Sequence, residues 1–394
     1  MTLKHDTSKP IIVQKYGGTS LADAGLVKKV AKNIVAKKEQ GYDLVVVVSA
    51  MGKTTDHFID LAHQICPNPD RREMDMLLSV GERISISLLA MAINATGKHH
   101  AVSYTGSQVG IITDDNHTQA QILEVKGHRL CQALEQGKIV IVAGYQGVSV
   151  SKEITTLGRG GSDTTAVALA AALNAEACEI MSDVDGIYTA DPRQILAARR
   201  IDRLDFEQAL ALASSGAKVL HKAAVEFARR HNVKLSLGSS FTGEIGTIVT
   251  DESMAKGFVT GVVSDDDLVV IRADMKDDNA IKLAHTLSLE KLNCKLWQFT
   301  GDRLLLGVSK SDAGAACDIV KKHAVLRREN NLSLLALVGT GVGIGSSPSK
   351  KFFEILENLS IKIHAIVSEE FFLKILLKNK EMERAAAAVH SALF

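Results

Sequence analysis

The stretch that decides the fold class lies near the N-terminus and reads PIIVQKYGGTS, residues 10–20. Its apolar half, 10–14, predicts a strand, and the glycines after it predict a tight turn that leads into an amphipathic helix over 23–38. The run DLVVVVS at 43–49 is continuous and β-branched, which is typical of a strand buried in a parallel sheet. Together these segments predict a β-α-β unit.

The same alternation continues to residue 250. It predicts a three-layer αβα domain over residues 1–250, with a mainly parallel sheet covered by helices on both faces. Its further predicted elements are helices over 74–95 and 164–174 and strands over 101–104, 138–143, 177–181 and 244–250.

Downstream of Asp251 the layout β-α-β-β-α occurs twice, which predicts two α+β, ferredoxin-like modules. We place these modules at 257–330 and 331–394, and the last strand of the chain is a candidate to complete the first one. The first copy has predicted strands over 267–272, 295–299 and 303–308 and helices over 281–292 and 313–323. The second has strands over 332–338, 361–367 and 371–377 and helices over 350–359 and 381–393.

Composition limits the classes of partner. The 394 residues carry 46 basic and 45 acidic side chains, and aromatic residues make up 4%. Neither value favours nucleic acid or an anionic membrane as a partner. The five cysteines form no CxxC pair, the 13 histidines form no HExxH or clustered pattern, and no apolar run approaches the ~20 residues of a membrane span. We therefore expect a cytoplasmic protein with reduced cysteines and no metal centre.

Two common nucleotide-binding motifs do not fit the chain. Gly52-Lys53-Thr54 resembles the end of a Walker A motif, but Val47 stands where that motif requires its first glycine. The alternating glycines of 339–345 give no GxGxxG register, and the HRD and DFG motifs of protein kinases do not occur.

The KYGGTS loop carries residue types suited to binding an anion. Gly17 and Gly18 let backbone amides approach an anion closely at a helix N-terminus, and Lys15 adds a full positive charge. This combination predicts a phosphate site. The structural alternative is a tight turn in which Ser20 caps the helix.

Two later loops have a similar character. TLGRGGSDTT at 156–165 lies between an expected hairpin and a helix, and the Arg159 fork suits a carboxylate. Asp163 either caps that helix or orients nearby cations. SDVDGIYTADPR at 182–193 places an aromatic side chain, a cation and carboxylates at the carboxyl end of a predicted parallel strand, where open α/β sheets bind ligands. Its Asp-Gly and Asp-Pro pairs are also ordinary turn formers.

These loops and three further motifs resemble the aspartokinases, a branch of the amino-acid-kinase superfamily. In family order the motifs are KYGGTS (15–20), VSAMGKTTD (48–56), GER (81–83), TLGRGGSDTTA (156–166), SDVDGIYTADPR (182–193) and SGAKVLH (215–221). The resemblance covers residues 11–250 densely, and the C-terminal modules resemble the paired ACT domains of that family more loosely. It implies an enzyme that transfers the γ-phosphoryl group of ATP, with Mg²⁺ carried mainly by the nucleotide, to the β-carboxylate of L-aspartate. That reaction begins lysine, threonine and methionine biosynthesis.

The resemblance also implies roles for matching residues. Lys15 and Lys218 would contact the transferring phosphoryl group and the ATP phosphates, and Asp163 would hold both lysines in place. The remaining residues of the implied nucleotide site are Gly17, Gly18, Ser182, Asp183, Tyr188 and Arg193. The implied aspartate site consists of Ser49, Thr55, Glu82, Arg159 and Ser162.

The chemistry agrees with these roles. The β-carboxylate of aspartate has a pKa near ~4, so it is already an ionised nucleophile at neutral pH and needs no general base. What remains is to bring two anions together, which cations, Mg²⁺ and fixed amides achieve. Arg159 can pair with the α-carboxylate of the substrate and Glu82 with its ammonium group. The alternative for Glu82 is a solvated carboxylate at a helix start.

The chain departs from the family pattern mainly in its C-terminal modules. ACT domains commonly enter their first helix through a DxPG-like turn near an amino-acid effector, but here the first copy reads DDNA at 277–280. The usual Ser-Thr-Ser-Glu-like stretch of the second copy reads IVSEE at 366–370. We therefore expect weak or altered feedback inhibition by lysine or threonine. In the catalytic part, Leu237-Gly238 replaces a common Val-Arg pair, so one cation near the nucleotide is expected to be missing.

Two alternatives stay open on the sequence. One is another amino-acid kinase, acting on glutamate, acetylglutamate or a nucleoside monophosphate. The other is an amino-acid sensor with an inactive kinase domain, which the set of Lys15, Asp163 and Lys218 opposes. From the length and the missing dinucleotide motif we expect no fused homoserine dehydrogenase. ACT modules of this family pair between subunits, so we expect a homodimer or a larger homo-oligomer.

Overall fold

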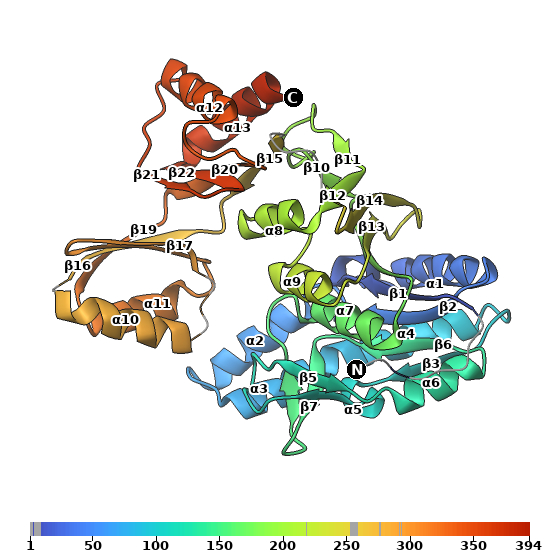
Figure 1. The fold of residues 1–394 in the computed structure, drawn as a ribbon. Coiled ribbons are helices and arrows are strands. Elements are labelled where there is room, and N and C mark those ends of the chain that lie inside the picture. The colour runs from blue at the N-terminus through green and yellow to red at the C-terminus, as the bar shows by residue number, and fades with distance from the viewer. Residues whose placement is uncertain are drawn as a thin grey trace. The chain divides into compact units, whose positions relative to one another are not determined.

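A computed structural model describes residues 3, 9–217, 219–252, 259–275, 277–290, 292 and 294–394. The chain forms two compact units (Figure 1). The first consists of Met1–Ile187, Arg200–Ala209 and Val219–Met254. The second consists of Tyr188–Arg199, Leu210–Lys218 and Ala255–Phe394.

The first unit is built on an eight-stranded sheet with the strand order β12-β14-β13-β9-β1-β2-β6-β3. The strands β13 and β14 run antiparallel, and the other described neighbours are parallel. This is the mainly parallel sheet that the sequence predicted. The strands are β1 (Ile11–Tyr16), β2 (Asp43–Val48), β3 (Ala101–Tyr104), β6 (Ile139–Ala143), β9 (Ala177–Ser182), β12 (Arg203–Asp205), β13 (Leu235–Ser239) and β14 (Ile245–Thr250).

Helices cover this sheet on both faces, which confirms the three-layer αβα domain. On one face α1 (Ala24–Glu39) and α4 (Val80–Asn94) bury their apolar sides against β1, β2 and β6. Strand β1 alternates, so Ile12 and Tyr16 point into this core while Lys15 points to the opposite face, toward α7 (Gly161–Leu173). The alternation of one strand therefore separates a core face from a functional face.

The predicted helix over 74–95 is two helices, α3 (Arg71–Leu78) and α4. Asp70 caps the start of α3 by accepting hydrogen bonds from the amides of Arg72 and Glu73. Ser79 separates the two helices, and its carbonyl accepts a hydrogen bond of 2.9 Å from Gln146 Nε2. Gln146 is 67 positions away in the sequence, so local sequence does not reveal that its side chain hydrogen-bonds the carbonyl between the two helices.

The run Arg71–Asn94 is long and apolar enough, by length and composition, to cross a membrane. Its α4 part contacts α1, β2, β3 and β6, and Ile86, Leu89 and Ile93 are buried in the domain core. These contacts are those of a core helix in a globular domain.

A small second sheet, with the order β5-β4-β7-β8, was not predicted from the sequence. Its strands are β4 (Ile111–Thr113), β5 (Ile122–Val125), β7 (Gln146–Ser149) and β8 (Ile154–Thr156). The antiparallel pair β7–β8 is the hairpin expected before the 156–165 loop. The sheet carries that loop toward the N-terminus of α7.

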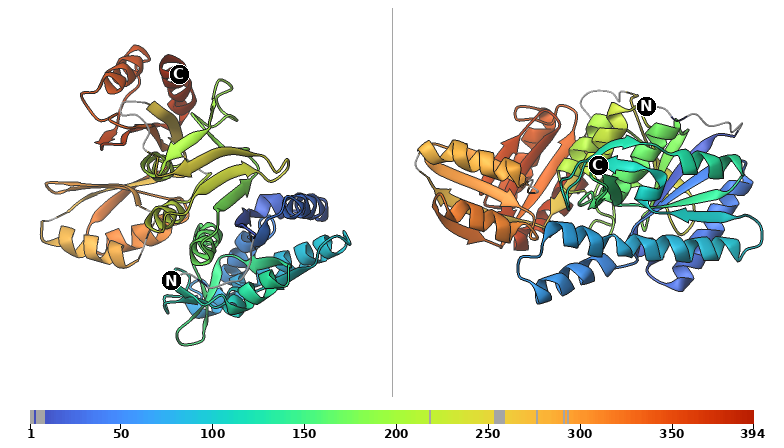
Figure 2. Two further views of the ribbon diagram at one scale, coloured as in Figure 1. Left: turned by 45° about the vertical axis from the view of Figure 1, so that its right-hand side comes forward. Right: turned by 90° about the horizontal axis from the view of Figure 1, so that it is seen from below.

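The second unit contains two antiparallel sheets, each covered by two helices (Figures 1 and 2). The first sheet has the order β17-β18-β16-β19, and α10 and α11 share its core. Its elements are β16 (Val269–Asp274), α10 (Asp277–Leu289), β17 (Cys294–Thr300), β18 (Arg303–Val308), α11 (Ala313–Lys321) and β19 (Val325–Glu329). The second sheet has the order β15-β20-β22-β21, with α12 and α13. Its elements are β15 (Val259–Asp265), β20 (Leu332–Gly339), α12 (Ser347–Asn358), β21 (Ala365–Ser368), β22 (Phe372–Lys378) and α13 (Asn379–Leu393).

The sheets do not follow the expected boundary between the modules. Strand β15 lies within the segment expected to form the first module, yet it pairs with β20 of the second. Val262 of β15 packs with Leu335 and Leu337 in the core of the second sheet. The first sheet is completed by β19, and the chain ends in helix α13, so the last strand does not complete the first module.

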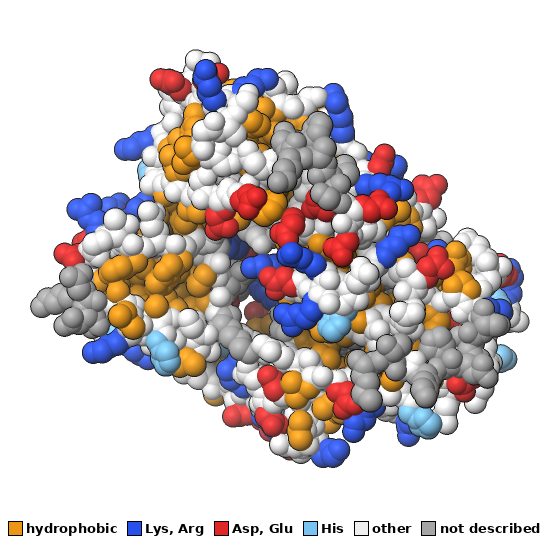
Figure 3. Space-filling view, viewed as in Figure 1, with side chains coloured by type: hydrophobic (Ala, Val, Ile, Leu, Met, Phe, Trp, Pro, Cys, Tyr) orange, Lys and Arg blue, Asp and Glu red, His pale blue; other side chains and the backbone are white. Residues whose placement is uncertain are grey.

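The remaining elements belong to the first unit, except that β10 and α8 each have residues in both units. They are η1 (Gly18–Leu21), α2 (Thr54–Ile65), α5 (Gly106–Val109), α6 (His128–Glu135), β10 (Ile187–Tyr188), β11 (Arg200–Ile201), α8 (Phe206–Ser214) and α9 (Lys222–Arg230). Basic and acidic side chains are interspersed over the face in Figure 3, in keeping with the formal net charge of +1.

Candidate active site

The centre of the candidate site is an ion pair between Lys15 and Asp163. Lys15 stands near the carboxyl end of β1, and Asp163 lies in the first turn of α7. The Nζ of Lys15 is 2.5 Å from Oδ1 of Asp163, and the two side chains are 14% and 11% exposed. The Lys15 ammonium group and the Asp163 carboxylate therefore lie near the carboxyl end of β1, largely shielded from water.

The glycine turn after β1 is shaped by close packing. A Cβ at Gly18 would lie 2.5 Å from the carbonyl oxygen of Ala50 and 3.1 Å from that of Gly52. Only glycine lets this turn pass against the loop that follows β2. Ser20 does not cap the next helix: its Oγ bonds Ser240 Oγ at 2.8 Å, and Asp23 caps α1 instead.

The second glycine loop leads into α7. Gly158 and Gly160 have φ angles of +75° and +70°, and Gly160 is the N-cap of α7. A Cβ at Gly160 would lie 2.0 Å from Cγ of His221. Because Gly160 occupies the cap position, Asp163 is not the cap and is left to pair with Lys15, which supports the orienting alternative. The first amides of α7 provide a helix N-terminus beside the ion pair.

His221 is a site residue to which the sequence reasoning gave no role, although the SGAKVLH motif contains it. Burial lowers its pKa, and Asp163, Lys15 and Arg159 are near enough to act on it electrostatically. Its Nδ1 is buried without a hydrogen-bond partner among the described residues. Its contact with Gly160 could not be foreseen, because 61 positions of sequence separate the two residues.

The residues predicted to bind the substrate aspartate come from several elements near the carboxyl ends of the parallel strands. Ser49 directly follows β2, and Thr55 lies in the first turn of α2. Glu82, in the first turn of α4, accepts a hydrogen bond of 3.0 Å from the amide of Ala50 at Oε1. This bond brings the VSAMGKTTD and GER motifs together.

Ser162 reaches the same region from α7. A Cβ at Gly144, just beyond β6, would lie 2.7 Å from Ser162 Oγ, and the Gly144 amide bonds the carbonyl of Val48 at 3.0 Å. Arg159 is exposed on the loop before α7. The structure therefore assembles Glu82 with the loop after β2, and Ser162 beside the ends of β2 and β6.

Glu82 has an unusual electrostatic environment. Burial raises the pKa of its carboxyl group to about 7, and hydrogen bonds from the backbone amides of Glu82 and Ala50 only partly oppose this. Its Oε2 is buried and has no hydrogen-bond partner among the described residues. A buried carboxyl group with an open oxygen is suited to accept an ammonium group. The solvated alternative considered for Glu82 does not agree with this burial.

The expected nucleotide residues are only partly described. Ser182 ends β9, and its Oγ donates to the carbonyl of Val184 at 3.0 Å, forming the turn that carries Asp183. Tyr188 and Arg193 belong to the second compact unit. Lys218 lies outside the described residues.

The departure at Leu237-Gly238 has a structural reason. A Cβ at Gly238 would lie 2.2 Å from the carbonyl oxygen of Glu244, at the irregular pairing of β13 with β14. The close approach of this backbone requires glycine. In the part of the chain that the structure describes, no group of three or more His, Cys, Asp or Glu side chains could hold a metal ion.

Comparison with known proteins identifies first the protein family and then the group of relatives within it. Residues 10–239 match the amino acid kinase family. The aspartokinase of Mycobacterium tuberculosis is 43% identical over 410 residues, covering 97% of this chain and 96% of that protein. The aspartokinase of Corynebacterium glutamicum is 41% identical over 408 residues, covering 96% of this chain and 95% of that protein. The structure of E. coli aspartokinase III in complex with aspartate and ADP shares the fold, with a TM-score of 0.82 at 24% identity, covering 98% of this chain and 100% of that chain.

The chain therefore belongs to the amino acid kinase family. Within that family its similarity over nearly the full length places it among the aspartokinases, which are kinases and hence transferases. The resemblance stated from six sequence motifs is confirmed.

Proposed function

We propose that the chain transfers the γ-phosphoryl group of ATP to the β-carboxylate of L-aspartate and so makes 4-phospho-L-aspartate. The observation that carries this proposal is the ion pair between Lys15 and Asp163, which lies between a glycine turn and a helix N-terminus. The aspartokinase relatives at 41–43% identity support the choice of acceptor. The product would enter lysine, threonine and methionine biosynthesis.

The positions of Lys15, Asp163 and the glycine turns favour phosphoryl transfer in which positive groups offset the charge of the two reacting anions. The substrate carboxylate is ionised at neutral pH, so the reaction requires no base. Lys15 would lie against the transferring group, and Asp163 would keep its ammonium group in place. The amides of Gly17, Gly18 and the start of α7 would cradle phosphate oxygens. Mg²⁺, carried by ATP, would neutralise further phosphate charge.

The aspartate substrate would lie between Glu82 and Arg159. Glu82 presents an open buried oxygen to the α-ammonium group, and the Arg159 fork suits the α-carboxylate. The hydroxyl groups of Ser49, Thr55 and Ser162 would orient the two carboxylates. The nucleotide site would be completed by Ser182, Asp183, Tyr188, Arg193 and Lys218.

The wider assignments follow from the same proposal. We assign catalysis to residues 1–250 and amino-acid sensing to the two antiparallel sheets after them, as ACT domains that respond weakly to lysine or threonine. A homodimer or larger homo-oligomer and a cytoplasmic location complete the proposal, since the cytoplasm supplies ATP and free aspartate.

The experiment that tests the proposal is a comparison of two lysine variants. Lys15→Ala should abolish aspartate-dependent ATP turnover while circular dichroism shows an intact fold. Lys37→Ala is the matched control, because Lys37 makes a comparable ion pair, 2.8 Å from Glu179 with side chains 21% and 6% exposed, away from the glycine turn. It should keep the activity. Activity retained by Lys15→Ala would contradict the assigned role of the ion pair.

The same assay separates the alternatives. Wild-type protein should turn over ATP with aspartate, and much less with glutamate or acetylglutamate. Turnover with one of the latter would identify a different amino-acid kinase, and no turnover with any acceptor would identify an inactive sensor.

A further inference from the structure

Asp75 is a buried carboxylate to which the proposed mechanism gives no role. It lies on α3, its side chain is 0% exposed, and three donors surround it. Thr156 Oγ1 donates to it at 2.5 Å, the amide of Thr118 at 3.0 Å and His117 Nδ1 at 2.7 Å. Because a carboxylate only accepts hydrogen bonds, His117 carries its proton on Nδ1.

The three donors come from segments that are far apart in the sequence. His117 and Thr118 belong to the loop between β4 and β5, and Thr156 is the last residue of β8. Directly after Thr156 the chain forms the loop that carries Arg159 and leads into α7, on which Ser162 lies. A buried charge is tolerated only when its partners are held in place, so Asp75 fixes where that loop begins.

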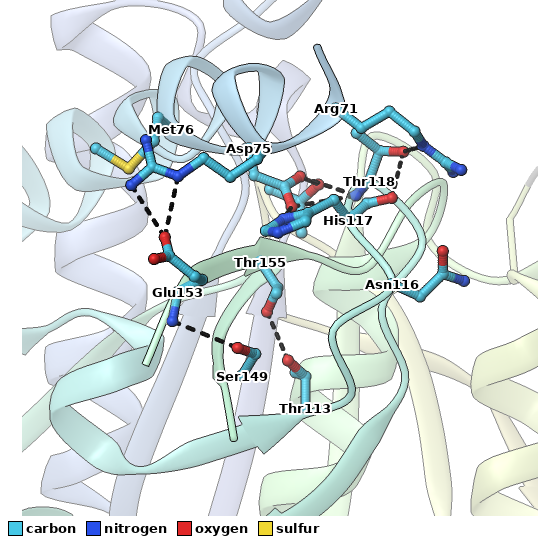
Figure 4. Close-up of polar contacts among 12 residues, drawn as sticks. Arg71, Asp75, Met76, Thr113, Asn116, His117, Thr118, Ser149, Glu153 and Thr155 are labelled. Carbon is cyan, nitrogen blue, oxygen red and sulfur yellow. Dashed lines mark hydrogen bonds and ion pairs between the residues drawn. The ribbon is translucent and has the colours of Figure 1, made fainter. Parts of the chain in front are cut away.

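A second set of contacts holds the same segments from the surface, as Figure 4 shows. Arg72 Nε bonds Glu153 Oε2 at 3.0 Å, and Arg71 Nε bonds Thr118 Oγ1 at 3.0 Å. These two arginines precede Asp75 on α3. The network therefore joins α3 to the β7–β8 hairpin and to the loop after β4 on more than one side.

The loop itself rests on these fixed segments. The amide of Ala120 bonds the carbonyl of Thr156 at 2.9 Å, and a Cβ at Gly158 would lie 3.2 Å from the carbonyl oxygen of Thr118. The hydroxyl group of Tyr145 hydrogen-bonds Thr156, and the Tyr145 ring lies against Gly161. A shift at Thr156 would therefore be passed directly to the loop.

The other half of the expected aspartate site is joined to Asp75 through its own helices. Asp75 lies on α3, and α4, which carries Glu82, starts directly after Ser79. The bond from Gln146 to the carbonyl of Ser79 fixes this junction against β7. Asp75 is thus linked, through α3 and α4 on one side and through Thr156 on the other, to the two groups expected to bind the substrate. These groups are the carboxylate of Glu82 and the guanidinium of Arg159.

We propose that Asp75 is a positioning residue for the substrate amino acid, acting through Thr156, with His117 as its supporting donor. It sets the distance between the Glu82 side and the Arg159 side of the pocket and touches neither the substrate nor ATP. This inference rests on the proposed aspartate site. It assigns a role in binding the amino acid, separate from the role of Lys15 in phosphoryl transfer.

The first test compares two neighbouring threonines of β8, both 0% exposed. Thr156→Val removes the hydroxyl group bound to Asp75, and the KM for aspartate should rise about tenfold while kcat and the KM for ATP change less than about threefold. Thr156→Ser retains the hydroxyl group and should restore the wild-type KM. Thr155→Val is the matched control, because it removes the equally buried bond of 2.6 Å from Thr155 to Thr113, and it should leave the KM for aspartate unchanged.

A second pair of variants keeps the test decisive if Thr156→Val does not fold. His117 is 20% exposed and so more tolerant of change. His117→Ala removes the Nδ1 donor and should raise the KM for aspartate about threefold, whereas His117→Asn retains a donor at that place and should not.

The outcomes separate this inference from the proposed function. Wild-type protein that shows no aspartate-dependent turnover would contradict the proposed function itself. Wild-type turnover, with Thr156→Val and Thr155→Val changing the KM for aspartate equally or not at all, would overturn the positioning role alone. Loss of kcat without a change of KM for aspartate in Thr156→Val would also overturn it.

Discussion

At the scale of single residues, the site depends on side chains whose surroundings change their chemistry. The sequence predicted Lys15, Asp163 and Glu82 because each lies in a motif with a recognisable residue pattern. It did not predict Asp75 or His221, because their significance comes from burial and from partners 40 or more positions away. A lone Asp or His in a sequence gives no sign of such partners.

Glu82 leads to a prediction about pH. Its pKa is raised to about 7 by burial, so the carboxyl group becomes mostly neutral as pH falls below that value. A neutral carboxyl group cannot pair with the ammonium group of aspartate, and a proton therefore competes with substrate. The KM for aspartate should rise as pH falls, approaching about tenfold per pH unit well below the pKa.

Steady-state kinetics between about pH 6 and about pH 8 would measure this effect. Glu82→Gln should have a high KM for aspartate that no longer varies with pH in this way, and its KM for ATP should stay near the wild-type value. A wild-type KM for aspartate that is flat across the range would show that Glu82 does not bind the ammonium group as a carboxylate.

At the scale of elements, local sequence predicted β1, β2, β3, β6 and β9 of the parallel sheet and helices α1 and α7, because their apolar runs are continuous or periodic. It missed β13, α2 and α9. It indicated a hairpin where β7 and β8 lie, but it did not predict β4, β5 or the sheet that these four strands form, since three or four residues are too few to show a period. It also merged α3 and α4, because the break at Ser79 is fixed by a distant side chain, Gln146. Elements were missed where tertiary contacts decide them.

The turn into α7 provides a prediction at this scale. Gly160→Ala places a Cβ 2.0 Å from Cγ of His221 at a φ of +70°, so either the turn or the histidine must move. The catalytic efficiency should fall at least about 100-fold, because the turn positions Arg159 and the first amides of α7.

The chain offers a control for the backbone strain alone. Gly137, in the turn between α6 and β6, has a φ of +73°, and a Cβ added there would meet no described atom within 4 Å. Gly137→Ala should lower the free energy of unfolding by about 1 kcal/mol and leave catalysis unchanged. Equal losses of activity in the two variants would show that general strain, and not the geometry of the α7 turn, is responsible.

At the scale of the whole molecule, the sequence predicted a catalytic domain followed by two small α+β modules. The exchange of β15 into the second sheet was not predicted, because a strand of seven residues contains no information about which of two similar sheets it joins. The pairing of β15 matters for regulation, because β15 is the first described strand after the catalytic part of the chain and joins that part to the second sheet.

Feedback inhibition provides a prediction at this scale. Helix α10 of the first sheet begins at Asp277, where DDNA stands in place of a DxPG-like turn. These residues form the first turn of α10 itself, and they contain neither the proline nor the glycine that would preset a DxPG-like turn for close approach to an effector. Lysine and threonine, each titrated to millimolar concentration in the aspartate kinase assay, should inhibit weakly. Potent inhibition by either amino acid would contradict this expectation.

The exchanged strand leads to a prediction about which fragments fold. The first sheet draws all four strands from 266–330, whereas the fragment 331–394 lacks β15. Without β15, the buried strand β20 becomes an open edge and Leu335 and Leu337 lose their contact with Val262. The fragment 266–330 keeps all its strands but exposes Val270 and Leu305, which pack with Leu334 and Leu376 of the second sheet. It should therefore give a folded circular dichroism spectrum with a cooperative but less stable thermal transition, and 331–394 should aggregate or stay unfolded. Joining 259–265 to the end of 331–394 through a glycine-serine linker should restore folding, because α13 packs on β15 and β20 and a strand linked after it can return to β20. Cooperative unfolding of 331–394 alone would show that β15 is dispensable for the second sheet.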